Sequence, residues 1–87
     1  MAGYELLIKP SAVKEIELID GKRVRRRVVQ RIRELAEDPR PKGCEKLARQ
    51  ECYRLRQGPY RIVYAVDDEQ HTVLIVKVGH RKEVYRK

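Results

Sequence analysis

The last third of the chain, residues 51–87, alternates hydrophobic and polar positions in the way that strands do. Three runs rich in Val, Ile, Leu and Tyr are separated there by turn-forming residues at 57–59 and 67–70. Short apolar runs between such turns are typical of an antiparallel three-strand meander. A further apolar run over residues 4–8 ends before Pro10 and predicts an N-terminal strand.

Between these strand-like stretches the period changes to that of an amphipathic helix. Residues 22–37 place apolar side chains three to four positions apart, which predicts a helix whose apolar stripe covers the sheet. The stripe consists of Val24, Val28, Ile32 and Leu35. Residues 12–19 predict a shorter helix before it, with Ser11 as its N-cap and Asp20 as a candidate cap for the longer helix.

These elements predict one small α+β domain over residues 1–87. We expect an N-terminal strand and a two-helix hairpin packed on a mainly antiparallel four-stranded sheet. A chain of this length buries only about 60–65% of its unfolded surface, so it forms a single modest core. That core must be mainly aliphatic, because the chain has no Trp or Phe and its five aromatic residues are all Tyr.

The composition is strongly basic, with a formal net charge of +8 and 39% charged residues. This balance favours a polyanion, an acidic protein or an anionic membrane surface as the partner. No apolar run approaches the roughly 20 residues that span a bilayer, and the N-terminus lacks a signal-peptide pattern. We therefore expect a cytoplasmic protein without a membrane segment, whose two cysteines, Cys44 and Cys52, are free thiols.

Positive charges also crowd the predicted longer helix, where seven of them precede the first acidic residue, Glu34. They are Lys22, Arg23, Arg25, Arg26, Arg27, Arg31 and Arg33. Solvated helix faces usually mix the two signs, so this run favours a surface for a polyanion or an acidic partner over a purely solubilising one.

The meander carries cations of its own on its polar positions. Alternate residues of a strand face opposite sides, so Arg54, Arg56 and Arg61 should all oppose the apolar side of the sheet. Because adjacent strands lie about 4.8 Å apart, the three guanidinium groups should meet on one patch. The third run ends with further basic residues, His80, Arg81 and Lys82.

Several fixed cations and a tyrosine, without a pair of carboxylates, suit phosphoryl transfer on RNA. Arginines stabilise the negative charge that spreads over the phosphate oxygens, and the RNA 2′-OH supplies the nucleophile. The sequence shows no acidic metal cluster, no Cys/His zinc pattern and no Gly-rich phosphate loop, so we expect neither a metal nor another cofactor. Residue types alone leave RNA cleavage, RNA binding and binding of an acidic protein open.

Three segments together carry a resemblance to a known family: residues 52–56 (CYRLR), 60–64 (YRIVY) and 78–85 (VGHRKEVY). They resemble the RelE branch of the RelE/ParE toxin superfamily, and the order of elements and the chain length also match, so the resemblance covers nearly the whole chain. It implies a RelE-like fold and the toxin of a type II toxin–antitoxin pair. Such a toxin is an endoribonuclease that cleaves mRNA in the ribosomal A site by metal-independent 2′-OH attack and so inhibits translation.

The resemblance also implies roles for single residues. The family's two basic positions on the second strand fall on Arg54 and Arg56. Its next arginine falls on Arg61, which would stabilise the charge of the phosphorane. Arg81 would serve the leaving 5′-oxygen, and Tyr85 would stack on or orient a nucleotide.

One departure from the family pattern affects the assignment of the base. The family commonly has lysine at the first two positions, whereas Arg54 and Arg56 have pKa values too high to accept a proton at neutral pH. They are therefore expected to stabilise charge. The base stays open, and His80 is our hypothesis for it because an unperturbed imidazole has a pKa of about 6.5.

The expected partners are mRNA on the ribosome, ribosomal RNA and an acidic RelB-like antitoxin. We expect a monomer when the protein is free and a hetero-oligomer with the antitoxin. RNA or ribosome contacts are expected at Lys77, Lys82 and Arg86.

Two alternatives remain within the resemblance. One is a ParE-type toxin that inhibits DNA gyrase by protein binding, and the other is a non-catalytic RNA-binding relative. Presence of Arg61, Arg81 and Tyr85 favours the nuclease over the ParE-type toxin, whereas arginine in place of lysine at positions 54 and 56 keeps the non-catalytic relative open.

Overall fold

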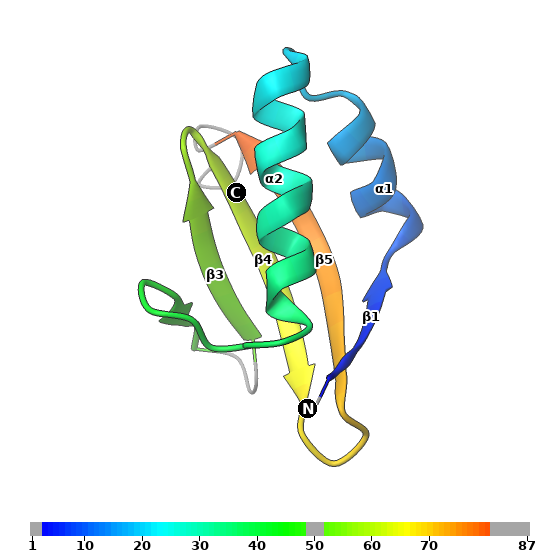
Figure 1. The fold of residues 1–87 in the computed structure, drawn as a ribbon, viewed down its shortest axis with the longest axis vertical. Coiled ribbons are helices and arrows are strands. Elements are labelled where there is room, and N and C mark those ends of the chain that lie inside the picture. Colours follow the sequence, from blue (N-terminus) through cyan, green and yellow to red (C-terminus); the bar gives the residue numbers. More distant parts are fainter. Residues whose placement is uncertain (1–2, 49–51, 81–87) are drawn as a thin grey trace.

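The computed structural model describes residues 3–48 and 52–80 and shows two helices packed on one face of a five-stranded sheet (Figure 1). Three of the four strand pairings are antiparallel, and β1 runs parallel to β5. The strands lie in the order β1-β5-β4-β3-β2. The elements are β1 (Glu5–Ile8), α1 (Pro10–Glu17), α2 (Lys22–Leu35), β2 (Glu45–Lys46), β3 (Cys52–Gln57), β4 (Tyr60–Asp67) and β5 (Thr72–His80).

The predicted α+β class, helix pair and meander are confirmed, but the sheet has one strand more than expected. The extra strand is β2, which pairs antiparallel with Tyr53 and Arg54 of β3. Two residues are too few to show an alternating pattern, so this strand is invisible to a periodicity argument. It extends the sheet on the side away from β1.

The helix ends differ from the sequence prediction for local reasons. Lys9 is the N-cap of α1, and Pro10 opens the helix, so the prediction of Ser11 as a cap was wrong. Proline fits the first helical position because its missing N–H would have had no partner there. Gly21, at φ 102°, caps α2 in place of Asp20, since a positive φ favours glycine. Both helices also end two residues before their predicted ends.

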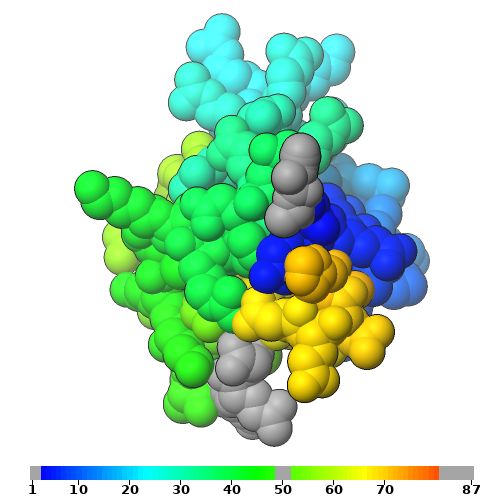
Figure 2. Space-filling model, turned by 60° about the horizontal axis from the view of Figure 1, so that its bottom comes forward, coloured from blue at the N-terminus to red at the C-terminus, as the bar shows by residue number. Residues whose placement is uncertain are grey.

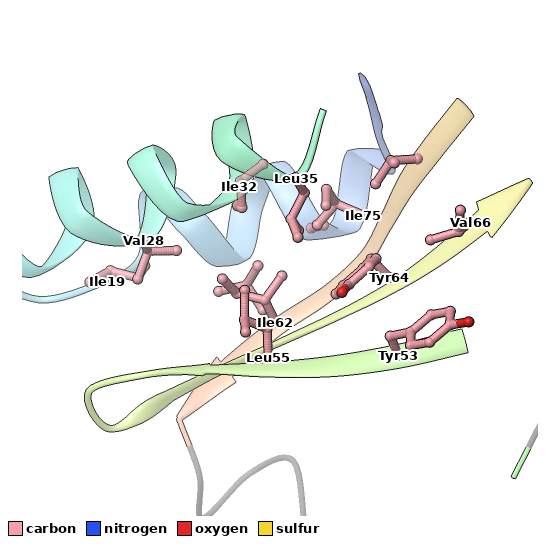
Figure 3. Packing of buried hydrophobic residues seen from close by; sticks show 13 residues of the cluster. Ile19, Val28, Ile32, Leu35, Tyr53, Leu55, Ile62, Tyr64, Val66 and Ile75 are labelled. Atoms are coloured by element: carbon pink, nitrogen blue, oxygen red, sulfur yellow. The ribbon is translucent and has the colours of Figure 1, made fainter. Parts of the chain in front are cut away.

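The core lies between the helices and the sheet (Figure 3). Val28, Ile32 and Leu35 of α2 are buried as predicted, and they face the sheet, where β4 carries Ile62 and Tyr64. The Tyr64 hydroxyl donates a hydrogen bond of 2.7 Å to the Pro39 carbonyl oxygen, so a buried polar tip is satisfied. Burial raises the pKa of Tyr64, which keeps the hydroxyl protonated as a donor.

A polar cluster joins Tyr4, near the N-terminus, to the β4–β5 hairpin. In Figure 2 the blue N-terminal residues lie against the yellow and orange residues of this hairpin. The Tyr4 hydroxyl donates to Asp68 Oδ1 at 2.8 Å, and the Tyr4 ring stacks on His71 with centroids 4.8 Å apart. Arg40 donates to Asp68 Oδ2 at 2.8 Å and to the Tyr53 hydroxyl at 2.8 Å. These contacts join the loop after α2 to the start of β3 and to the turn between β4 and β5.

A β-bulge in β5 decides which side chains of its second half face the helices. Val63 pairs with Lys77 and Tyr64 pairs with Ile75, so Val76 is an extra residue on β5. Beyond this bulge, Lys77 and Gly79 belong by register to the open face of the sheet, and Val78 belongs to the helix side. Neither helix of the described chain is long and apolar enough to cross a membrane.

Candidate functional site

Arg54, Arg56 and Arg61 lie on the face of the sheet that the helices leave open. The pairing register proves this, because Arg54 pairs with Val63 and Arg56 pairs with Arg61, whereas their neighbours Leu55 and Ile62 pair with each other in the core. The shared face predicted from strand alternation is therefore confirmed. The catalytic roles of the three arginines stay a prediction.

Arg61 is the most constrained of the three cations. It is only 5% exposed, and it stands between Arg56 on β3 and Gly79 on β5 in one row across the sheet. Gly79 has no side chain, so it adds no group to this row. A buried cation meets a lower local dielectric than a surface one, so its field on a nearby phosphate is stronger.

Arg54 is positioned by an acidic neighbour that the sequence reasoning missed. Its Nη2 and Nε atoms donate to Glu45 Oε1 at 2.6 and 3.1 Å, and Glu45 pairs with Arg54 in the β2–β3 register. Neither of these hydrogen bonds uses Glu45 Oε2. The hydrogen bonds from Arg54 hold the pKa of Glu45 below its usual range. The positive charges of Arg54, Arg56 and Arg61 lower this pKa as well.

Glu45 therefore adds an ionised carboxylate to a face that the sequence presented as purely cationic. It was missed because we searched for pairs or clusters of carboxylates and because β2 is too short to be read from alternation. The sequence signal available for Glu45 was its position directly before Lys46 and Leu47, where the chain enters the sheet.

His80 does not join the three arginines. Tyr60 pairs with His80 two residues beyond the Ile62–Val78 pair, which places His80 on the helix side of the sheet by register. Its ring meets the Tyr60 ring edge to face, with centroids 5.5 Å apart. Both rings border a small cavity of about 140 Å³ together with Glu15 of α1.

Lys77 belongs to the open face by register, but its ammonium group reaches the edge of the sheet. There Nζ donates to Glu15 Oε2 at 3.1 Å, and Glu15 Oε1 accepts the Val78 backbone N–H at 2.8 Å. The expected RNA contact at Lys77 would have to displace this ion pair.

The remaining predicted site residues, Arg81, Lys82, Tyr85 and Arg86, lie outside the described residues. Within residues 3–48 and 52–80, no group of three or more His, Cys, Asp or Glu side chains is arranged to hold a metal ion. Cys44 and Cys52 are free thiols, as expected.

Comparison with known proteins decides the family. Residues 6–85 match the family model described as the ParE toxin of a type II toxin–antitoxin system. The chain belongs to the RelE/ParE toxin superfamily. It is also 35% identical to the mRNA interferase toxin RelE of Escherichia coli over 94% of this chain and 90% of that protein.

Solved structures of RelE proteins share the fold. The archaeal RelE–RelB complex from Pyrococcus horikoshii OT3 contains a chain with a TM-score of 0.82 and 27% identity, and the match covers 100% of both chains. The isolated E. coli RelE toxin has a TM-score of 0.78 and 32% identity, over 94% of this chain and 90% of that one. These relatives place the chain in the RelE-type branch of the superfamily.

Proposed function

We propose that this protein is the toxin of a type II toxin–antitoxin pair and cleaves mRNA in the ribosomal A site as a metal-independent endoribonuclease. The observation that carries the proposal is the row of arginines on the open face of the sheet, with Arg61 almost fully buried in it. The name of the E. coli relative, an mRNA interferase toxin, supports the same activity. Cleavage of mRNA in the A site would stop translation.

The proposed reaction is a transesterification within the RNA. The 2′-oxygen attacks the adjacent phosphorus, the bond from phosphorus to the 5′-oxygen breaks, and the products are a 2′,3′-cyclic phosphate and a 5′-hydroxyl. Negative charge grows on the phosphoryl oxygens as the new bond forms, and fixed cations lower the energy of that state. Arg61 would bear most of this stabilisation because it is held in place, while Arg54 and Arg56 would add to the field.

The reaction needs a group that takes the proton from the 2′-hydroxyl, and we propose Glu45 for this role. Its carboxylate lies on the arginine face, and its pKa is lowered, so that it is ionised at neutral pH. A general base must be unprotonated and within reach of the proton that it removes. His80 remains the competing candidate, although it lies on the opposite face by register.

Two further roles rest on the family resemblance. Arg81 would stabilise the charge on the leaving 5′-oxygen, which takes its proton from water, and Tyr85 would stack on a nucleotide. Both residues fall within the matched range 6–85 of the family model. Lys82 and Arg86 would contact RNA backbone.

The proposed regulatory partner is an acidic RelB-like antitoxin that forms a hetero-oligomer with this chain. The solved complex of RelE with RelB from P. horikoshii supports this proposal. The +8 charge of the chain favours an acidic partner by electrostatic complementarity.

A cleavage assay tests the proposed function. Purified protein is mixed with mRNA-programmed ribosomes that have an empty A site, beside a sample of the same mRNA alone. We expect cleavage within the A-site codon only when ribosomes are present, and a 2′,3′-cyclic phosphate at the new end. Growth arrest by a folded protein that cuts neither sample would contradict the proposal and direct attention to DNA gyrase as the target.

A further inference from the structure

A second cationic surface lies on α2, on the other side of the molecule from the arginine face of the sheet. An open groove of about 430 Å³ runs along the helix, and none of its lining residues is acidic. Its walls are Lys22, Arg25, Arg26, Val29, Gln30 and Arg33. We call this surface the α2 groove. In Figure 2 the cyan side chains at the start of α2 stand out from the body of the molecule.

The cations of the α2 groove form no ion pair within the described residues, although Arg33 also borders a second cavity with Glu34, Glu37 and Asp38. Lys22, Arg26 and Arg33 make no ion pair or side-chain hydrogen bond with residues 3–48 or 52–80. Arg31, on the neighbouring stripe of the same helix, is by contrast paired with Glu34 at 3.3 Å. The groove thus offers cations to an external anion.

One cation of the groove, Lys22, lies where a positive charge weakens the helix, whereas Arg33 lies in the last turn, where a cation is favourable. The N-terminal end of a helix carries partial positive charge, which favours acidic side chains there and disfavours basic ones. The first turn of α2 has no acidic residue, and Lys22 and Arg23 open it. Helix stability therefore does not explain the position of Lys22, and binding of an anion would.

The chemistry of the α2 groove fits a phosphate backbone better than a protein. An amphipathic protein segment needs apolar anchors, and the groove offers only the partly exposed Val29. The most exposed large apolar side chain, Leu18 at 81%, lies outside the groove. The guanidinium fork matches phosphate geometry, and interfaces with nucleic acid are more polar and more basic than protein interfaces.

We propose that the α2 groove is a second RNA site, which binds the phosphate backbone of structured RNA while the sheet face takes the strand to be cut. From Lys22 to Arg33 the helix extends about 16 Å at roughly 1.5 Å per residue, enough to follow several phosphates. The choice of RNA over DNA rests on the proposed function. The groove would contribute affinity for the ribosome and would take no part in the chemistry.

The test compares two double variants of equal charge change on the same helix. R26Q/R33Q removes two cations of the α2 groove, and R23Q/R27Q removes two exposed arginines outside it. Binding to a fluorescent RNA hairpin, 2′-O-methylated throughout so that it cannot be cleaved, is measured by anisotropy between 50 and 200 mM KCl.

We expect R26Q/R33Q to weaken binding at 200 mM KCl by about tenfold and to reduce the slope of log affinity against log salt by about 2, since each lost phosphate contact removes about 0.9. R23Q/R27Q should change affinity by less than about twofold, because it leaves the contacts intact. Equal losses in both variants would overturn the proposal in favour of diffuse attraction. The proposal would also be overturned if R26Q/R33Q bound the hairpin as well as the wild-type protein, or if the wild-type protein did not bind it. In either case, a loss of affinity for the antitoxin in R26Q/R33Q would identify the groove as a protein-binding site.

The ribosome assay separates this proposal from the proposed function. R26Q/R33Q should raise the ribosome concentration needed for half-maximal cleavage and leave the maximal rate unchanged. A fall in the maximal rate alone would overturn the assignment of the groove to binding. Absence of cleavage by the wild-type protein would refute the proposed nuclease, while the hairpin measurement would still decide the α2 groove.

Discussion

The two arginine-rich surfaces of this protein hold their cations in different ways. On the sheet, Arg61 is buried. Arg54 forms an ion pair with Glu45, and its side chain is only 23% exposed. On α2, Arg26 and Arg33 are exposed and form no ion pair in the part of the chain that the structure describes. Both surfaces have the same residue type, but only the first fixes where the charge lies.

This difference separates catalysis from attraction. Fixed charges can be aimed at a transition state without being reorganised during the reaction, which is the main source of electrostatic catalysis. Mobile surface charges attract a polyanion over a distance, and salt screens them with a Debye length of about 8 Å at physiological ionic strength. Substitutions on the sheet should therefore change the rate of cleavage, and those on α2 should change affinity.

The largest expected effect comes from Arg61→Gln. We expect the maximal cleavage rate on ribosomes to fall by at least about 10²-fold, the loss typical of removing one preorganised charge donor. Single-turnover cleavage at saturating ribosome concentration measures it, and a circular dichroism melt shows whether the variant folds. Arg23→Gln is the matched control. A folded Arg61→Gln variant that retained full activity would remove the sheet face from the mechanism.

Glu45→Gln should lower the maximal rate by about 10- to 100-fold if its carboxylate takes the 2′-proton. Because the pKa of Glu45 is lowered, the wild-type rate should hold from pH 7.5 down to 5.5, where a carboxylate stays ionised. A base with the ordinary histidine pKa of about 6.5 would lose activity over the same interval.

His80→Ala distinguishes the two candidates for the base. We expect it to keep most of the wild-type rate, since His80 faces the helix side of the sheet. Loss of activity in His80→Ala, together with a rate that falls below about pH 6.5, would return the role of base to His80.

Salt gives a smaller and more selective effect. Raising KCl from 50 to 200 mM at constant Mg²⁺ should increase the ribosome concentration for half-maximal cleavage by about tenfold or more and change the maximal rate less than about twofold. Titration of ribosomes at each salt concentration measures both quantities. If the half-maximal ribosome concentration and the maximal rate changed equally with salt, the proposed assignment of binding to α2 and catalysis to the sheet would be wrong.

Arg40 lies outside both arginine-rich surfaces and makes structural contacts. We expect the smallest effect from removing its contact with Asp68. Arg40 and Tyr4 hydrogen-bond to Asp68 and lower its pKa, so the ionised carboxylate stabilises the fold above the unfolded-state pKa of about 3.9. That contribution is lost as pH falls through the lower folded-state pKa. Asp68→Asn should slightly reduce the melting temperature at pH 7, and the difference from wild type should shrink as the pH falls below about 3.9, with cleavage unchanged.

Much of this arrangement is present in the sequence because it follows from short-range periodicity. A period of 3.6 residues fixes which side of α2 is buried, and strand alternation fixes that Arg54 and Arg56 share a face. Both rules depend only on residues a few positions apart. They hold here because α2 and the strands β3 and β4 are uninterrupted over that distance.

The sequence did not determine what depends on pairing between distant segments. Glu45 meets Arg54 only because a two-residue strand pairs with β3. The bulge at Val76 shifts β5 by one residue, and such a shift exchanges the two faces for every later side chain. It therefore places Gly79 beside Arg61 and turns His80 toward the helices. The local pattern of the sequence specified the helices and strands and the cations that they carry. Long-range strand register decided which of those groups share a face, because the residues next to a position in the chain do not determine which strand will pair with it.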